Sequence, residues 1–244
     1  MKENTLLKIA KDFGSPVYVY DAEKIEFQYK RLTKAFGKVK QLRLNYAVKA
    51  LSNITILKLF NKLGSGIDTV SIQEVQLGIK AGFKPENIIF TPNGVSLEEI
   101  EKAAKLGVQI NIDNLSILEQ FGTKHPKIPV CIRINPHVMA GGNTNVFLYA
   151  SEILFETAKN FKNLEFIDFG SGFKVPYKLG DIETNIEELG EKLSQRFNEF
   201  CKEYGKDLTL AFEPGKFLVS EAGVFLAKVN VVKQTTSTVF ASID

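Results

Sequence analysis

The chain has 244 residues, of which 44% are hydrophobic and 24% are charged, a composition typical of a globular protein with a sizeable core. Its net charge is only +3, which gives no reason to expect nucleic acid or a membrane surface as a partner. The segment Met1–Asp12 lacks the apolar stretch of a signal peptide, and no apolar run reaches the roughly 18 residues of a membrane span. Two isolated cysteines, Cys131 and Cys201, suit a reducing compartment, so we expect a cytoplasmic protein.

Short apolar segments rich in β-forming residues recur along the chain. They cover residues 44–48, 66–70, 88–91, 108–112, 129–134, 164–169 and 208–212. Between most of them lie amphipathic patterns with capping boxes at the start or a glycine at the end, the clearest over residues 54–63, 71–81, 96–106 and 186–204. This alternation predicts a parallel sheet. Strands this short and apolar favour a closed (β/α) barrel over an open doubly wound sheet.

A complete barrel of this kind has eight strands, so the pattern is one strand short. The deficit lies after the fifth segment, where the glycine-rich stretch 140–145 runs directly into a helical pattern over 146–161. Elsewhere the chain gives each strand its own turn and helix before the next strand begins. We therefore expect an α/β barrel that lacks one β/α unit near 145/146.

The working residues of a (β/α) barrel sit at the C-terminal ends of its strands. Lys49 closes the first strand, where a partly desolvated amine can form a Schiff base, although position alone favours a lysine that extends into solvent. Asp68 ends the second strand and either holds a positive charge beside Lys49 or serves as a turn residue. Glu74 is the fourth residue of a capping box that begins at Ser71, which explains it without chemistry.

Polar residues and glycines also end the later strands. The fifth strand ends with Arg133 inside it and Asn135 just after it. An arginine in an apolar strand is expensive to bury, so we expect a functional or paired buried role for Arg133. Cys131 in the same strand is expected to pack in the core. Gly170 and Gly172 follow the next strand, where glycine lets backbone N–H groups turn towards a phosphate.

The last strand ends in a glutamate and a tight turn. Glu213 can pair with a cationic ring nitrogen, Gly215 can offer a further N–H to a phosphate, and Lys216 adds a positive charge; a Glu–Lys surface turn is the alternative. The two histidines, His125 and His137, are expected to be bystanders. We find neither metal-ligand spacing nor a Ser-His-Asp arrangement.

The order of these motifs is more specific than any one of them. Along nearly the whole chain they resemble the diaminopimelate decarboxylase family, through YAVKA at 46–50, GSGIDTVSIQE at 64–74, FTPNG at 90–94, RINP at 133–136, DFGSGF at 168–173 and EPGK at 213–216. That family belongs to the alanine-racemase-like barrel class of pyridoxal-phosphate enzymes. The resemblance implies the last step of lysine biosynthesis, in which meso-diaminopimelate loses one carboxylate to give lysine and carbon dioxide, carried out by a homodimer.

The resemblance also implies roles around the cofactor, pyridoxal 5'-phosphate. Lys49 resembles the lysine that carries it, with Asp68 and Glu74 as an acidic pair nearby, and Arg133 resembles the arginine beside its phenolic oxygen. Glu213 matches the glutamate that pairs with the pyridine nitrogen and keeps it protonated, the state in which the cofactor is the better electron sink. Racemases of the same class typically place an arginine there, so Glu213 favours a decarboxylase.

The remaining carried-over roles concern the phosphate. Gly170, Ser171 and Gly172 match the family's glycine-rich phosphate loop, and Gly215 matches a further phosphate contact. Lys216 stands where most members have an arginine that binds the phosphate and the substrate carboxylate.

Two features of the family are missing from this sequence. One is the strand after RINP that ends in His-x-His-x-Gly-Ser, and the other is most of a second, β-sheet domain that supplies a cysteine and a tyrosine to the partner's site. We therefore expect a lead segment over 1–20 that packs with the second domain, a barrel over 21–223 and the start of that domain over 224–244. We also expect the chain as written to have little decarboxylase activity.

Several alternatives stay open at this point. The substrate could instead be carboxynorspermidine, ornithine or arginine, or the chain could be an inactive fragment. A non-enzymatic pyridoxal-phosphate carrier is a further alternative, but the EPGK turn at 213–216 argues against it.

Overall fold

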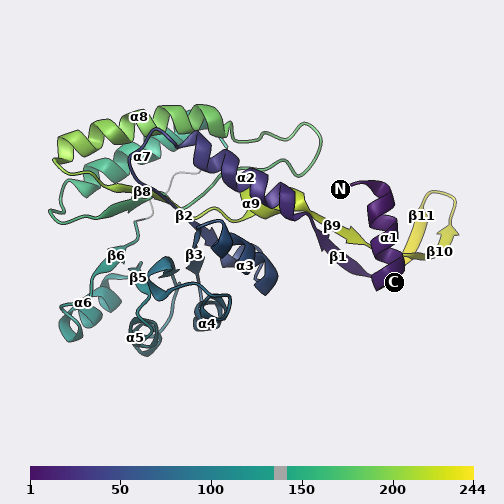
Figure 1. The fold of residues 1–244 in the computed structure, drawn as a ribbon, viewed down its shortest axis with the longest axis horizontal. Helices are drawn as coiled ribbons and strands as arrows, with labels where there is room; N and C mark the ends of the chain where they lie inside the picture. Colours follow the sequence, from purple (N-terminus) through teal and green to yellow (C-terminus); the bar gives the residue numbers. More distant parts are fainter. Residues whose placement is uncertain (135–141) are drawn as a thin grey trace.

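In a computed structural model that describes residues 1–134 and 142–244, parallel strands form one curled sheet (Figure 1). The seven strands are β2 Leu42–Ala47, β3 Gly66–Thr69, β4 Ile88–Phe90, β5 Gln109–Ile112, β6 Val130–Ile132, β7 Phe166–Asp168 and β8 Thr209–Phe212. Their order is β6-β5-β4-β3-β2-β8-β7. Each falls within or overlaps a predicted segment, so the expected barrel-type α/β fold is confirmed.

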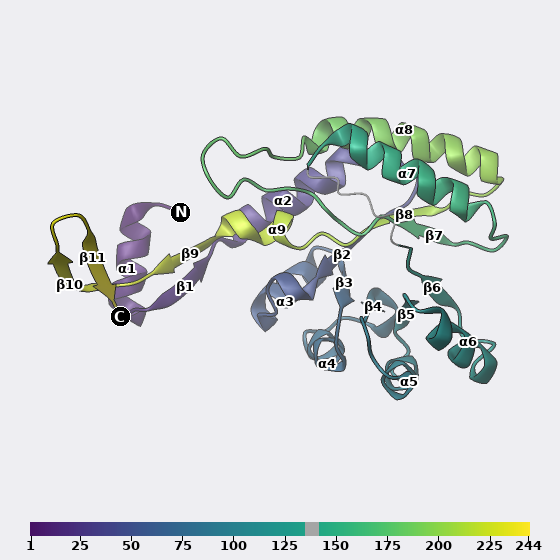
Figure 2. The ribbon, with the colours of Figure 1, turned by 180° about the vertical axis from the view of Figure 1, so that it is seen from behind.

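Helices cover the outside of the curl on both of its arms. In Figures 1 and 2, α3 to α6 lie along one arm, and α2, α7 and α8 lie along the other. The bounds are α2 Ala22–Ala35, α3 Ile54–Lys62, α4 Ile72–Lys80, α5 Leu97–Lys105, α6 Leu115–Lys124, α7 Thr144–Ala158, α8 Ile186–Tyr204 and α9 Lys216–Val219, with 3-10 turns η1 Val48–Ala50, η2 Pro85–Asn87 and η3 Ser220–Ala222. The predicted caps are present: the Ser71 hydroxyl accepts from the Glu74 N–H, and Gly205 ends α8 in the left-handed conformation.

The sheet stays open where the missing unit was expected. Among the described residues, β6 is bonded to β5 alone and β7 to β8 alone, so these two strands are the edges. Ile132 and Ile134 at the β6 edge are each 39% exposed, a surface that a neighbouring strand and helix would cover in a closed barrel. The predicted junction at 145/146 falls in the first turn of α7, which follows β6 in the chain.

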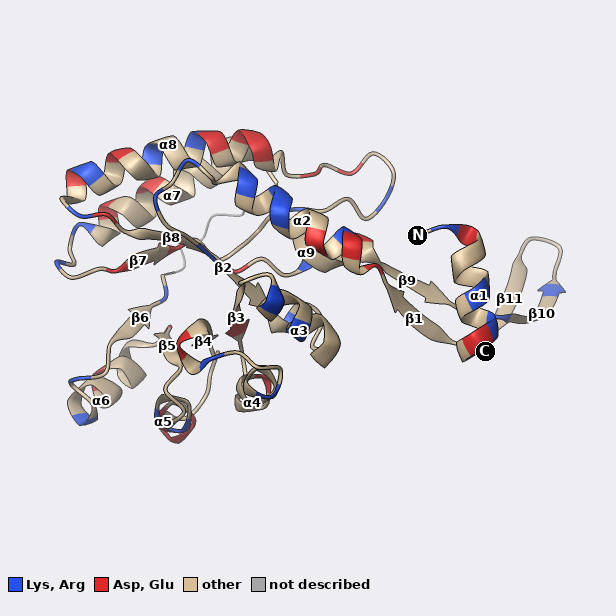
Figure 3. Cartoon of the chain, viewed as in Figure 1, with Lys and Arg blue, Asp and Glu red and all other residues tan. Residues whose placement is uncertain are grey.

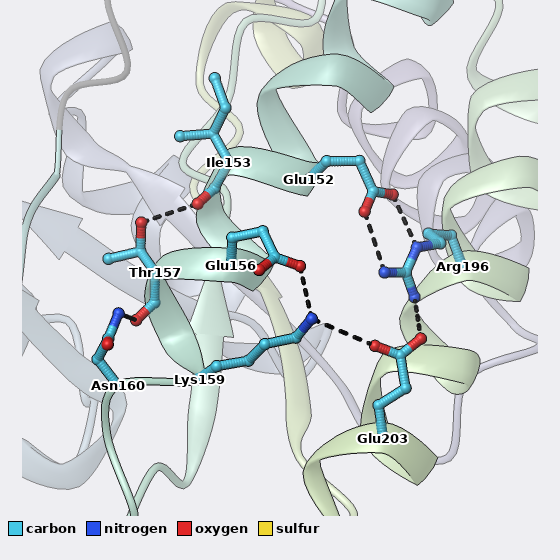
Figure 4. Close-up of polar contacts among 8 residues, drawn as sticks. All are labelled: Glu152, Ile153, Glu156, Thr157, Lys159, Asn160, Arg196 and Glu203. Carbon is cyan, nitrogen blue, oxygen red and sulfur yellow. Dashed lines mark hydrogen bonds and ion pairs between the residues drawn. The ribbon is translucent and has the colours of Figure 1, made fainter.

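Helix α7 packs firmly on α8 although the unit before it is absent. The Phe155 ring stacks on Phe200 with centroids 4.6 Å apart. Figure 4 shows the polar side of this contact, in which the Arg196 guanidinium bonds Glu152 through Nε at 2.7 Å and through Nη2 at 3.0 Å. Its Nη1 reaches Glu203 at 3.1 Å. Ion pairs this exposed each add little stability. The buried stack of Phe155 on Phe200 is therefore the main contribution to the stability of the α7–α8 contact.

The first and last elements project to one side of the sheet (Figures 1 and 2). Helix α1, Glu3–Phe13, precedes β1, Val17–Tyr20, which pairs antiparallel with β9, Gly223–Leu226. Strands β10, Val229–Gln234, and β11, Val239–Ile243, form a hairpin. The division of the chain at 20/21 and 223/224 remains a prediction.

Charged side chains of both signs alternate over the outer helices, most clearly along α8 (Figure 3). Mixed charge of this kind is typical of a solvated helix face. In the part of the chain that the structure describes, no helix combines the length and apolarity needed to cross a membrane.

Candidate active site

A cavity of about 950 Å³ opens at the C-terminal ends of the strands. Most of the predicted site residues line it, namely Lys49, Arg133, Gly170, Ser171, Gly172, Glu213, Gly215 and Lys216. Asp68 lies beside it within bonding distance of Lys49. Asn135 and His137 fall outside the described residues.

Lys49 is in η1, directly after β2, and reaches into the cavity from the sheet. Its side chain is 58% exposed, and its Nζ lies 3.4 Å from Oδ2 of Asp68, whose side chain is fully buried. Asp68 pairs in register with Ala47, so the ends of β2 and β3 lie at the same height in the sheet. Burial raises the pKa of Asp68, while Lys49 and the Thr91 hydroxyl oppose that rise. The pair therefore joins an accessible amine to a buried carboxyl.

Glu74 serves the helix cap rather than the cavity. Its Oε2 accepts from the Val70 N–H at 2.8 Å, and its own N–H donates to the Ser71 hydroxyl at 3.2 Å. Burial raises the pKa of this carboxyl, and Asp68 adds to the rise. The capping explanation from the sequence is sufficient for its geometry.

Glu213 follows β8 and lies at the inner wall of the cavity. Burial raises its pKa to about 9, with Asp168 and Asp68 adding to the rise and Lys49 and Arg133 opposing it. At this pKa the carboxyl is protonated at neutral pH. A cation placed against it favours the ionised form. Such a shift in a cavity is typical of functional sites.

The glycine turns allow the backbone to approach a ligand closely. Gly170 and Gly172 have φ angles of 61° and 121°, which residues with a side chain adopt at a cost. A Cβ on Gly215 would lie 3.0 Å from the Ala50 Cβ and 3.2 Å from the Ala47 Cβ, so this turn sits tightly on the end of β2. Backbone N–H groups in such turns form concavities that bind phosphate.

The structure differs from two expectations about burial in β6. Arg133 was expected within the buried strand, but it lies just past Ile132 and is exposed, with its N–H donating to the Ile112 carbonyl at 2.9 Å. Arg133 does line the cavity, and its functional role stays a prediction. Because β6 is an edge strand, the side on which a neighbour would cover this residue is open. Cys131 was expected in the core, but it lines the cavity. Burial raises the pKa of its thiol to about 12, so the thiol is protonated at neutral pH.

Sequence reasoning missed Asp168, which also lines the cavity. Burial raises its pKa to about 7, against the effects of the Gly170 N–H and Arg43. Its Oδ1 accepts from the Gly170 N–H at 2.8 Å. The available signal was an acidic residue closing an apolar strand immediately before the glycines of DFGSGF.

Neither histidine was singled out as a catalyst. His125, at the end of α6, is half-buried, and its Nε2 lies 3.0 Å from Oε1 of Glu101. This contact is outside the cavity lining. The described residues also contain no cluster of His, Cys, Asp and Glu suited to a metal ion.

The barrel and its cavity have the form of a cofactor-dependent decarboxylase domain. A family model described as "Pyridoxal-dependent decarboxylase, pyridoxal binding domain" matches residues 22–147 and 148–220. The chain belongs to this family. The match is divided between residues 147 and 148, close to the gap that the sequence predicts near 145/146.

Individual relatives make the comparison more specific. The diaminopimelate decarboxylase of Methanothermobacter thermautotrophicus is 28% identical over 292 aligned positions, which cover 98% of this chain and 68% of the relative. The Campylobacter jejuni enzyme of the same name is 28% identical, with 97% and 71% covered. Both alignments are longer than this chain, so each contains positions that the chain lacks.

Solved structures agree with these relatives. Diaminopimelate decarboxylase from Helicobacter pylori, complexed with L-lysine, superimposes with a TM-score of 0.78 at 27% identity, covering 98% of this chain and 72% of that one. The M. jannaschi enzyme superimposes with a TM-score of 0.83 at 22% identity, covering 98% and 69%, and supports the fold alone.

The residues present fit pyridoxal phosphate. An aldehyde needs an accessible amine, which Lys49 provides, and a pyridinium needs a buried anion, which Glu213 provides by releasing its proton. A phosphate needs converging N–H groups, and the turns at Gly170–Gly172 and Gly215 have the required backbone. The cavity is large enough for the cofactor and an amino acid together.

Proposed function

We propose that this site decarboxylates meso-diaminopimelate to lysine and carbon dioxide, with pyridoxal phosphate carried on Lys49. The observation that carries the proposal is the arrangement of the Lys49 amine, the Glu213 carboxyl and the Gly170–Gly172 turn around one cavity. The choice of substrate is supported by diaminopimelate decarboxylases that are 25–29% identical over nearly the whole chain.

When bound, the cofactor supplies an electron sink for the pair that the departing carboxylate leaves behind. Glu213 holds a proton at the far wall of the cavity, and a cationic nitrogen placed against it favours the ionised carboxylate. Lys49 is the group that binds the cofactor, and its Nζ, 3.4 Å from Asp68, is placed to hold or pass a proton.

The cations at the rim have a separate task. Arg133 and Lys216 both line the cavity and are exposed, so they can bind carboxylates of an incoming amino acid. The Lys216 Nζ lies 5.6 Å from the centroid of the Tyr177 ring, which also lines the cavity. We propose that Arg133 also contacts the cofactor's phenolic oxygen.

The proposal extends to the assembly and the compartment. We infer a homodimer, supported by the exposed apolar side chains Val232, Val239 and Phe240 on the β10–β11 hairpin. We infer a cytoplasmic location, supported by the free thiols of Cys131 and Cys201. Size-exclusion chromatography with light scattering tests the dimer directly.

Borohydride reduction tests the attachment of the cofactor. The chain is incubated with pyridoxal phosphate and reduced, and the labelled peptide is mapped. Label is expected on Lys49 and is expected to disappear in Lys49→Ala. Lys174→Met is the matched control, because Lys174 lines the same cavity and should not affect the label. Label on Lys174 or Lys216 would overturn the assignment.

Release of carbon dioxide tests the substrate. The rate with meso-diaminopimelate is compared with the rates for ornithine, arginine and carboxynorspermidine, using a chain in which the missing β/α unit is supplied from the Methanothermobacter relative. Faster release from meso-diaminopimelate than from the other three is expected. Preference for one of the others would replace the proposed substrate.

A further inference from the structure

Arg43 and Asp168 lie on the same face of the sheet, on either side of a small residue. In register, Arg43 of β2 pairs with Ala211 of β8, and Asp168 of β7 pairs with Ala211 from the other side. Residues in register across parallel strands point to the same face, and the Ala211 methyl leaves the space between them open. The three strands are labelled in Figure 2, and their pairing places β8 between β2 and β7.

The Arg43 side chain crosses that space. Its Cζ lies 4.2 Å from the centroid of the Phe166 ring, which belongs to β7. Phe166 precedes Asp168 by two positions, so both project from the same face of β7. The guanidinium therefore lies below Asp168, within the curl of the sheet and beneath the cavity, which it does not line.

Both groups have buried polar atoms without a partner. Among the described residues, Nε and Nη2 of Arg43 and Oδ2 of Asp168 are buried and make no hydrogen bond. Two cationic donors and a carboxylate acceptor on one face are complementary, and a buried charge is costly unless it is paired. The Asn45 side chain, two positions along β2 from Arg43, is a further donor that acts on Asp168.

Asp168 connects this buried cation to the candidate active site. Its Oδ1 accepts from the Gly170 N–H at 2.8 Å, and the Gly170 carbonyl accepts from the Glu213 N–H at 2.6 Å. One carboxylate thus fixes the first residue of the glycine turn, which in turn fixes the backbone of Glu213. The charged groups that act on Asp168 are Arg43 from β2 and Asp68 from β3, and Asp168 itself acts on Glu213, which follows β8.

We propose that Arg43 and Asp168 form a buried charge pair that positions the Gly170–Gly172 turn for the phosphate of the cofactor. Arg43 is a positioning residue that acts through Asp168. The claim about the cofactor rests on the proposed function, whereas the existence of the pair does not.

A double-mutant cycle on the full chain tests the pair. The affinity for pyridoxal phosphate, followed by absorbance, is measured in Arg43→Met, in Asp168→Asn and in the double variant. Each single change leaves one buried charge alone and should weaken binding about tenfold or more, within the 10–100-fold range known for residues that orient metal ligands. The double variant should bind better than the product of the two losses predicts. Losses that simply multiply would overturn the pair.

The Asp168→Ala variant distinguishes the positioning of the Gly170 N–H by residue 168 from the effect of the Asp168 charge. Asparagine at 168 keeps an acceptor for the Gly170 N–H, whereas alanine does not, so combining Arg43→Met with Asp168→Ala should not recover affinity. Equal recovery with asparagine and with alanine would overturn the positioning role.

Urea unfolding of the cofactor-free chain repeats the cycle without the cofactor. The midpoint urea concentration of Arg43→Met/Asp168→Asn should fall by less than the sum of the falls in the two single variants. Additive falls would overturn the pair. If Lys49 fails to take up label while this cycle shows coupling, the proposed function fails and the pair stands.

Discussion

Replacing Glu213 by glutamine should change how the stability of the cofactor-free chain depends on pH. Burial and the neighbouring Asp168 and Asp68 raise the pKa of Glu213 from the ordinary 4.5 to about 9. Between these two values the folded chain holds a proton on Glu213 that the unfolded chain has released. Folding therefore takes up a proton over this window, and stability falls as the pH rises through it.

The size of the effect follows from the same linkage. Each pH unit within the window costs about 1.4 kcal/mol, so raising the pH from 7 to 9 should cost roughly 2–3 kcal/mol through Glu213. That is a substantial part of the roughly 5–15 kcal/mol by which domains are stable. Asp168, with a pKa near 7, contributes mainly at lower pH. Glutamine cannot titrate, so the variant should lose less stability between pH 7 and 9.

Urea unfolding at pH 5, 7 and 9 measures the prediction, with Glu119→Gln on the exposed surface of α6 as the control. The control should follow the unchanged chain at every pH. If Glu213→Gln shows the same fall between pH 7 and 9 as the unchanged chain, the carboxyl does not carry the extra proton and the reasoning is refuted. In the chain with the barrel completed, the same substitution should slow decarboxylation by roughly 10²-fold or more while cofactor binding is kept.

Three further outcomes concern packing and closure. Gly215→Ala should destabilise the chain by about 1–3 kcal/mol in urea unfolding, because its Cβ would come 3.0 Å from that of a neighbouring alanine, whereas Gly122→Ala, with open space around it, should not. Phe155→Ala should cost about 3–5 kcal/mol because its ring is fully buried, while exposed Tyr149→Ala should change little, and the reverse order would contradict the packing. The unchanged chain should release carbon dioxide from meso-diaminopimelate well below about 1 s⁻¹, because the strand that ends in His-x-His-x-Gly-Ser in the family is missing from its cavity wall. Turnover near that value would show that the gap between β6 and β7 does not limit the enzyme.

Much of the fold and the kind of chemistry could be predicted from the sequence. Apolar runs and capping signals depend on neighbouring residues along the chain, so the seven strands of the curled sheet and helices α3, α4, α5, α7 and α8 were predictable, as was the absence of one unit after β6. Lys49, Asp68 and Glu213 could be selected because strand ends meet at one edge of a parallel barrel. Their roles towards the cofactor rest on the resemblance and remain predictions.

Which side chains are covered depends on the tertiary structure. Arg133 is exposed because β6 is an edge, and Cys131 lines the cavity that the curled sheet partly encloses; both outcomes depend on strands distant in the sequence. The alignment of Arg43 with Asp168 across Ala211 likewise depends on the register of three strands, two of which come from the last third of the chain. Local patterns specify where a strand begins and ends, but burial, and with it every shifted pKa in the site, is set by the neighbours that the fold brings alongside.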